Sequence, residues 1–314
     1  MFGVHVNKEG RQMDNAIIEE MKRLTDYAGD IITAPCAQIF VTGPRTYKVT
    51  IDEKTAERIK KLNIPIVFHG AYVDRPWSGN EMALKNIYKE LQIGNSMSAN
   101  GLVLHLSSSV NVSSEGSSES SSEGSSKSSS ESSSESSSVK DTFIINLKKI
   151  TERSDGMIIW LETHTAKPSK NTFETPEKIA KLFKRIHQSG IKNVGLCIDT
   201  AHLFSCGMAL YTREDAVNWI QAVSVIGVPL MFHLNDSASK LASGIDKHAP
   251  ICHGEIWKQY HTTTGDFPFK DSGVCAIIEY CMENKLMMIF ERHNDDVCKD
   301  LKILADMCNH VEAN

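Results

Sequence analysis

Residues 157–162 read MIIWLE, five apolar residues followed by a carboxylate. The same form recurs along the chain at IPIVFH (64–69), LVLH (102–105), VGLCID (194–199), PLMFH (229–233) and LMMIFE (286–291). Short runs of β-branched, aliphatic and aromatic residues are typical of buried strands. A histidine or carboxylate at the end of each run indicates that metal-capable side chains meet at one rim of a parallel barrel.

The rest of the chain follows a repeating pattern of strand and helix. Strands are expected at residues 2–6, 38–41, 64–69, 101–106, 157–162, 194–199, 228–234 and 286–291. Helices are expected at 13–24, 52–62, 81–91, 175–190 and 295–308, with two more beginning near 139 and 212. This alternation predicts an α/β fold, a single (β/α)8 TIM barrel with the metal site at the C-terminal rim of its strands.

Length and composition fit one such barrel, because 314 residues is normal for a (β/α)8 chain. We recognise no secretory leader, and no apolar run approaches the roughly 18 residues of a membrane span. We therefore expect a soluble intracellular protein without a membrane partner. The eight cysteines form no CxxC pair, which predicts reduced thiols and neither a disulfide frame nor a Cys-type zinc site.

A low-complexity tract interrupts the pattern after the fourth expected strand. Residues 107–138 repeat SSSE and SSEG, with five Glu and one Lys, and offer little to bury. We expect a disordered loop insertion, with residues 1–106 and 139–314 forming the barrel domain. A tolerated surface expansion explains it most simply; alternatively, the acidic tract competes with an anionic substrate. Without it the net charge of −5 becomes about −1, and bound divalent ions would make the body positive.

Two short motifs add candidates to the strand ends. Asp199-Thr200-Ala201-His202 puts a histidine one turn after a carboxylate, and Asp246-Lys247-His248 puts both groups on one side of an extended segment. The candidate metal ligands are His69, His105, Glu162, Asp199, His202, His233, Asp246, His248 and Glu291. Five imidazoles and four carboxylates without a thiolate suit Zn²⁺, with Mn²⁺ or Fe²⁺ as substitutes. Three ions fit this set if one carboxylate bridges.

Each candidate alone has a simpler explanation. A histidine after a strand is commonly a hydrogen-bonded rim residue, and Asp199 or Asp246 alone suits a helix cap or a turn. The coincidence at six strand ends is what favours metal binding. For His5 and His164 we expect roles in supporting the ligands.

At these residues the chain resembles the endonuclease IV class of AP endonucleases, also called AP endonuclease family 2. The resemblance runs from Phe2 to Glu291 outside the Ser-rich tract, and its details are most similar to the version in large cytoplasmic DNA viruses. The motifs that carry it are FGVHV (2–6), LH (104–105), LET (161–163), CIDTAH (197–202), FHLND (232–236) and IDKH (245–248).

The resemblance implies a role for every candidate ligand. His69, His105 and Glu162 would hold the first zinc ion; Glu162 as a bridge, Asp199, His233 and Glu291 the second; and His202, Asp246 and His248 the third.

It also implies contacts with DNA. Tyr72 matches a family position beside the lesion, although simple packing at the rim is an alternative, and Gln38 and Arg45 would occupy a loop that enters the groove. The family usually has Arg where this chain has Lys247, so a bidentate phosphate contact becomes a point charge.

The implied reaction is hydrolysis of the DNA phosphodiester 5′ to an abasic site, in base excision repair. Zinc lowers the pKa of water from about 15.7 to roughly 7, and Glu162, Asp199 and Glu291 would be the catalytic carboxylates. The expected partner is double-stranded DNA containing abasic sites, and the expected state is a monomer in the cytoplasm or nucleus, a viral factory or a virion.

Two alternatives remain open. A single-metal sugar isomerase or epimerase on the same barrel needs only Glu162, Asp199, His233 and Glu291. A non-catalytic lesion-binding relative would be favoured by the loss of a ligand, and no ligand position has lost its residue type.

Overall fold

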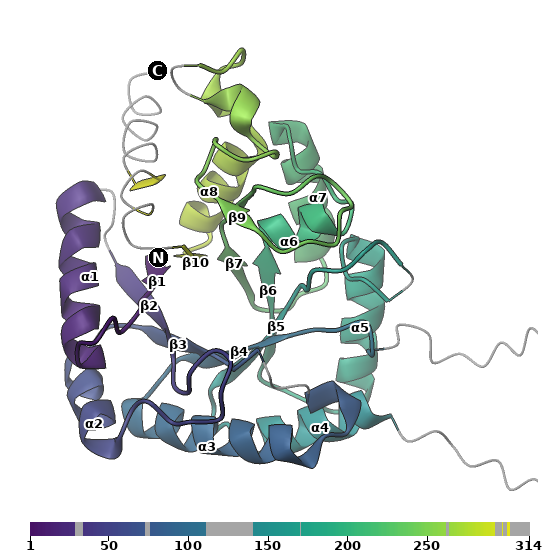
Figure 1. The fold of residues 1–314 in the computed structure, drawn as a ribbon. Coiled ribbons are helices and arrows are strands. Elements are labelled where there is room, and N and C mark those ends of the chain that lie inside the picture. The colour runs from purple at the N-terminus through teal and green to yellow at the C-terminus, as the bar shows by residue number, and fades with distance from the viewer. Residues whose placement is uncertain are drawn as a thin grey trace, which may run out of the picture.

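The computed structural model describes residues 1–28, 34–72, 76–110, 141–169, 171–261 and 264–292, together with residues 297, 300 and 301. Parallel strands close into a barrel in the order β1-β10-β7-β6-β5-β4-β3-β2 (Figure 1). The strands are β1 (Phe2–His5), β2 (Pro35–Phe40), β3 (Ile66–His69), β4 (Gly101–His105), β5 (Ile158–Glu162), β6 (Val194–Asp199), β7 (Leu230–His233) and β10 (Met287–Phe290). The predicted TIM barrel is confirmed.

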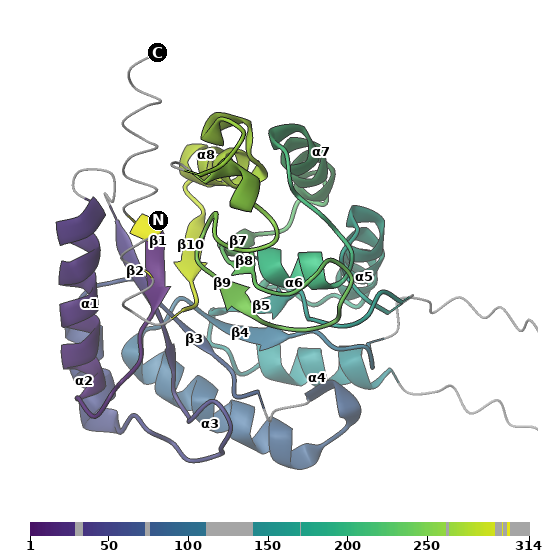
Figure 2. The same ribbon diagram turned by 45° about the horizontal axis from the view of Figure 1, so that its top comes forward.

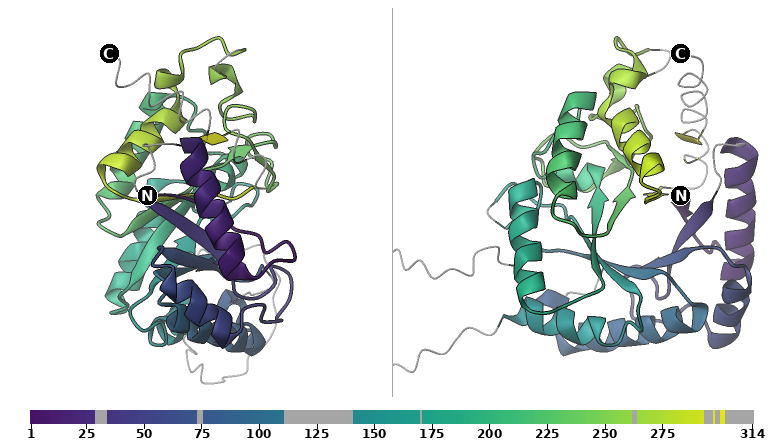
Figure 3. Two further views of the ribbon diagram at one scale, coloured as in Figure 1. Left: turned by 90° about the vertical axis from the view of Figure 1, so that its left-hand side faces the viewer. Right: turned by 180° about the vertical axis from the view of Figure 1, so that it is seen from behind.

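Helices surround the barrel on its outside (Figures 1 and 3). They are α1 (Met13–Ala28), α2 (Glu53–Lys61), α3 (Glu81–Met97), α4 (Thr142–Thr151), α5 (Pro176–Gln188), α7 (Arg213–Ser224) and α8 (Gly273–Glu283). Most begin after a side chain that accepts a backbone N–H of the first turn, namely Asp52, Asn80, Asp141, Thr175, Thr212 and Ser272. Among the described residues, no helix is both long and apolar enough to cross a membrane.

The differences from the predicted elements are local. Strand β2 begins at Pro35, three residues earlier than expected, because a proline without an N–H is tolerated at the first position of a strand. Helix α8, the short helix α6 (Thr200–Ser205) and the strands β8 (Asp236–Ser237) and β9 (His248–Ala249) had not been predicted. Most of the predicted helix at 295–308 and the Ser-rich tract beyond residue 110 lie outside the described residues.

The interior of the barrel is filled by side chains from the strands. Cys36, Val67, Val103, Trp160, Cys197, Met231, Met287 and Ile289 form this cluster. The Trp160 ring lies against two glycines, since a Cβ at Gly101 or Gly195 would come within 2.5 Å of it. Burial raises the pKa of the Cys36 and Cys197 thiols to about 12, so both stay protonated. The six described cysteines are buried and free, as predicted.

The register of the barrel brings the candidate ligands to one rim. His105 pairs with Glu162 and Asp199 pairs with His233 in adjacent parallel strands. Side chains alternate along a strand, so each ligand shares the inward face of the interior residue two positions before it, as Glu162 does with Trp160. The antiparallel β8–β9 pair lies beside α6 at this rim and carries His248 (Figure 2).

Candidate metal centre

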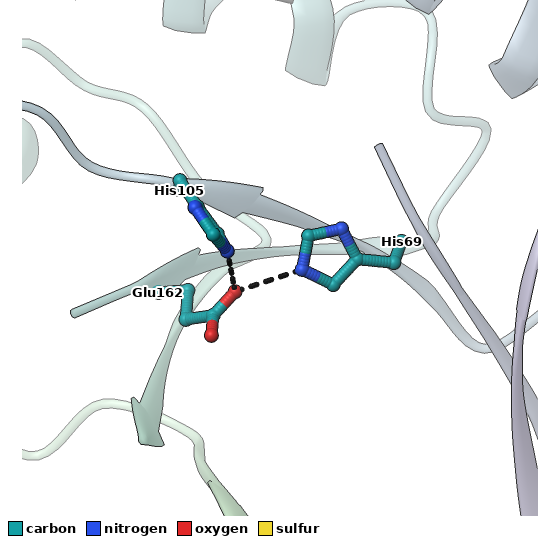
Figure 4. A group of neighbouring side chains, drawn as sticks. All are labelled: His69, His105 and Glu162. Carbon is teal, nitrogen blue, oxygen red and sulfur yellow. Dashed lines mark hydrogen bonds and ion pairs between the residues drawn. The ribbon is translucent and has the colours of Figure 1, made fainter. Parts of the chain in front are cut away.

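The first group of donors consists of His69, His105 and Glu162, from the ends of β3, β4 and β5. The Nε2 atoms of His69 and His105 lie 2.9 and 2.8 Å from the same oxygen, Oε2 of Glu162. Figure 4 shows the two imidazoles directed at that oxygen from different strands. Their rings meet edge to face at 4.9 Å, so their nitrogen donors converge on one point.

The second group shares Glu162 with the first and adds Asp199, His233 and Glu291. His233 Nδ1 lies 3.0 Å from Glu162 Oε1 and 3.0 Å from Glu291 Oε2. Glu162 therefore turns Oε2 to the first group and Oε1 to the second, and its carboxyl group is fully buried between them. This is the arrangement of a bridging carboxylate.

The third group takes its donors from the end of β6, from α6 and from β9. Ligand atoms of Asp199, His202 and His248 come within 4.8 Å of one another. Asp246 reaches the same place, with its two oxygens 3.4 Å from His202 Nε2 and 3.2 Å from His248 Nε2. Asp246 is half exposed, unlike the strand-end ligands, because it comes from the loop before β9. All nine predicted ligand positions thus gather at one rim, and Asp199 stands between the second and third groups.

In four of the histidines, the ring nitrogen that points away from the donor group is hydrogen-bonded, and this arrangement fits metal binding. His69 Nδ1 donates to Gly70 O and His202 Nδ1 to Thr163 O, both at 2.7 Å. His248 Nδ1 donates to Glu291 O at 3.3 Å. His233 uses the opposite nitrogen, Nε2, which lies 2.9 Å from Gln38 Oε1. Metal-binding histidines usually donate their second nitrogen in this way, which leaves the first as a lone-pair donor.

Two of the ring nitrogens that face the donor groups are not used in hydrogen bonds. The Nε2 atoms of His202 and His248 are buried and make no hydrogen bond with any residue that the structure describes. A buried polar atom without a hydrogen bond is costly, and each of these lies 3.2–3.5 Å from carboxylate oxygens of the third group. Imidazole and carboxylate donors together are the set that Zn²⁺ accepts in proteins.

The electrostatics of the centre favour positive charge. Burial lowers the pKa of His202, but the carboxylates of Asp199 and Asp246 outweigh burial and raise it well above 6.5. The same opposition brings the pKa of His248 to about 9. Burial raises the pKa of Glu291 and Glu162, yet the surrounding histidines hold both below the usual value. The carboxylates remain charged and attract cations, and a divalent ion competes with the imidazole protons for the same space.

Gln38 is placed differently from the prediction. It was expected on a loop that enters the DNA groove, but it lies within β2 and is fully buried. Its amide contacts His233, Glu291 and His5, so no atom is left to reach DNA. The prediction is wrong because Gln38 follows Cys36 by two residues and shares its inward face.

Two residues of this network carried no predicted role. Asn235 donates from Nδ2 to Asp199 Oδ2 at 2.7 Å, and its Oδ1 accepts the backbone N–H of Glu291. Thr163 holds Asp199 from the other side, since its hydroxyl accepts the Asp199 N–H at 3.0 Å. The FHLND and LET motifs contained both residues, but only the fold shows what they contact.

Of the other predicted DNA contacts, Tyr72 and Lys247 line a groove beside the metal ligands, and Arg45 follows Pro44, which also lines it. Tyr72 is half exposed, and its ring lies 5.4 Å from that of His69 and 5.5 Å from that of His105. Arg45 is exposed on a turn whose neighbour Pro44 accepts the Tyr72 N–H. Lys247 is exposed and lines a groove together with Tyr72 and Pro44. These three side chains are free to meet a large substrate, as Gln38 is not.

His5 and His164, for which supporting roles are predicted, are both buried. The ring nitrogens of His164 make no hydrogen bond with a described residue, so its role stays a prediction. His5 Nδ1 accepts from the Gln38 amide at 3.0 Å, and burial lowers the pKa of His5 to about 4. Burial also lowers the pKa of His164 to about 4, and its backbone oxygen accepts from Cys206 Sγ. Both are neutral imidazoles at physiological pH.

Comparison with known proteins agrees with this geometry. The family described as the xylose isomerase-like TIM barrel, AP endonuclease family 2, matches residues 29–307. A probable AP endonuclease of African swine fever virus (isolate Tick/Malawi/Lil 20-1/1983) is 34% identical over 267 residues, 82% of this chain and 78% of that protein. The crystal structure of AsfvAP:AG has a TM-score of 0.80 and 28% identity, covering 98% of this chain and 99% of that chain. Endonuclease IV from Thermus thermophilus, at 18% identity and a TM-score of 0.68 over 98% of this chain and 99% of that one, shares the fold. This chain therefore belongs to AP endonuclease family 2, the endonuclease IV class.

Proposed function

We propose that this protein hydrolyses the DNA phosphodiester on the 5′ side of an abasic site, using three zinc ions, as a step of base excision repair. The observation that carries the proposal is the sharing of donors at the rim. Glu162 joins the first group to the second, and Asp199 stands between the second and the third. A substrate held over this rim meets all three groups at once.

The residues divide the work of holding the ions. His69, His105 and Glu162 hold the first; Glu162, Asp199, His233 and Glu291 hold the second; His202, Asp246 and His248 hold the third. Ions bound there lower the pKa of water and neutralise charge on the attacking and leaving oxygens of the phosphodiester. The buried carboxylate of Glu162 fixes the spacing of the first two groups. Mn²⁺ or Fe²⁺ can substitute, because the donors are nitrogen and oxygen.

The mouth of the centre suits a distorted duplex. An abasic site lacks one base, so bending or opening the duplex there costs less than elsewhere. The half-exposed ring of Tyr72 fills the space beside the missing base, while Arg45 and Lys247 contact phosphates. We infer that the protein acts on its DNA substrate as a monomer, inside the cell.

The sugar isomerase alternative uses only part of this centre. Isomerases and epimerases of the same fold need one ion, which the second group alone would hold. They give no reason for His69, His105, His202, Asp246 and His248 to complete two further groups at the same rim. The nuclease uses every one of them.

The test is to map the cut. A duplex with one synthetic abasic site, labelled in turn at each end, is incubated with the protein beside the same duplex without a lesion. We expect one cut 5′ to the lesion that leaves a 3′-hydroxyl, and no cut in the undamaged duplex. Cleavage on the 3′ side, equal cleavage of both duplexes, or a folded and metal-replete protein that cuts neither would reject the proposal.

A further inference from the structure

Gln38 occupies a position that no ligand assignment explains. It lies in β2, paired with His5 of β1 and Val67 of β3, and its side chain is fully buried at the inner rim of the barrel. A buried primary amide carries two donors and an acceptor that all need partners. Among the described residues, every hydrogen-bond partner of the Gln38 side chain belongs to the metal centre or touches it.

The amide is held in one orientation by its neighbours. Its nitrogen donates to Glu291 Oε1, which as a carboxylate only accepts, and to His5 Nδ1 at 3.0 Å. Its oxygen lies 2.9 Å from His233 Nε2. The reversed amide would set an oxygen against a carboxylate, so the observed direction is the only one that satisfies all three contacts.

This orientation decides the state of His233. The Gln38 oxygen can only accept, so the proton of His233 must lie on Nε2. In the neutral ring, the form that can bind a metal ion, Nδ1 then carries the lone pair, and it is this atom that stands 3.0 Å from both Glu162 and Glu291. Through the same amide, Glu291 is held by its Oε1 while Oε2 faces the donor group.

We propose that Gln38 is a positioning residue that fixes the tautomer of His233 and the rotamer of Glu291 for the second ion, with His5 holding the amide in place. The inference rests on the metal centre of the proposed function. It predicts that loss of Gln38 weakens one ion of three and leaves the first and third groups intact. A residue that merely filled space would weaken none of them.

The test measures zinc affinity by competition with a chromophoric chelator. Gln38→Met keeps the volume and removes every hydrogen bond, so we expect one of three ions to bind roughly 10- to 100-fold more weakly, the usual effect of losing such a partner. The matched control is Asn146→Leu, another buried amide, whose nitrogen bonds Pro76 O beside α4, outside the centre. It should bind three ions with wild-type affinity.

A second variant protects the test against misfolding. Gln38→Glu retains an oxygen that accepts the His233 proton, so it should keep Nε2 protonated, as read from ¹⁵N shifts of the histidine rings in the zinc-loaded protein. Gln38→Met should lose that fixed tautomer. Wild-type affinity for all three ions in Gln38→Met, or a His233 proton on Nδ1 in the zinc-loaded wild type, overturns the inference.

Binding and incision are separate readings. If the wild type binds three ions and fails to cut abasic DNA, the proposed reaction falls while the role of Gln38 is still measured. If the wild type binds no divalent ion at the second group, the role of Gln38 falls with it.

Discussion

Glu162 gives one oxygen to the two histidines of the first group and the other oxygen to His233 of the second. Imidazoles thus enclose its carboxyl group on both sides, and they hold its pKa well below the usual value against the effect of burial. Its charge is therefore fixed, and two of the three donor groups share it.

Replacing Glu162 by Gln should remove two ions at once. The amide keeps the shape of the side chain but offers only one uncharged oxygen, so it cannot bridge. We expect the zinc content to fall from three ions towards one and the rate of incision to fall by roughly 100-fold or more. Loss of a residue that only hydrogen-bonds a metal ligand typically costs about 10- to 100-fold. Zinc is counted by elemental analysis on the folded variant. The control is Glu279→Gln, which disturbs the contacts with Arg213 and Cys275 on the outer helices. Three bound ions in Glu162→Gln would refute the bridge.

Tyr72 should matter for the lesion and not for the metal. Tyr72→Ala removes the exposed ring that lies beside His69 and His105, and we expect weaker incision of abasic duplex with three ions still bound. Tyr72→Phe keeps the ring and should keep most of the activity. Unchanged incision kinetics in Tyr72→Ala would leave the ring as simple packing at the rim.

Side chains at the ends of the strands form hydrogen bonds with the segments around them. Asp199 ends β6 and also caps α6, because its Oδ1 accepts the N–H of His202 at 2.9 Å. Asn235, just after β7, reaches both Asp199 and the backbone of Glu291 after β10. One amide thus ties three strand ends together.

Asn235→Ala should therefore weaken zinc binding, although Asn235 is not itself a predicted ligand. We expect zinc affinity to fall by roughly 10- to 100-fold at the ions that Asp199 and Glu291 serve. The control is Thr212→Ala, which removes the capping box of α7 and should cost about 1 kcal/mol of unfolding free energy without changing zinc binding. The same chelator competition decides it, and equal affinities in Asn235→Ala and wild type would contradict this role.

The positions of the strands also explain which site residues could be predicted from the sequence and which could not. A ligand at the end of an apolar run, such as Glu162 or His233, is readable because strand ends meet at one rim in a parallel barrel. Gln38 was misplaced because its strand begins at a proline and its own position looked like the start of the strand. Its inward direction could have been read from Cys36 two residues earlier. Helix α8 was not predicted because apolar residues run consecutively from Val274 to Ile278, so the sequence shows little amphipathic periodicity.

Protons and metal ions compete for the same buried histidines and carboxylates. In the metal-free protein the folded pKa of His248 is about 9 and those of His202 and His233 are raised above 6.5. A raised histidine pKa stabilises the folded state fully below about 6.5, and that stability is lost as pH rises through the folded value.

We therefore expect chelator-treated protein to have a lower unfolding free energy at pH 9 than at pH 6.5. The zinc-loaded protein should show the opposite trend over the lower part of this range, because deprotonated imidazoles bind metal better. Urea unfolding at the two pH values, with and without zinc, measures both. Equal unfolding free energies of the metal-free protein at pH 6.5 and 9 would show that the pKa values of these histidines are not raised in the folded state.

The most direct measurement joins ion count to reaction. Metal-free protein is titrated with zinc while bound ions are counted and incision of a duplex with one abasic site is followed in the same samples. We predict no incision without metal, full incision 5′ to the lesion once three ions are bound, and an intact undamaged duplex throughout. Folded protein that holds three zinc ions and leaves the abasic duplex uncut, or that cuts it with no metal bound, would contradict the account.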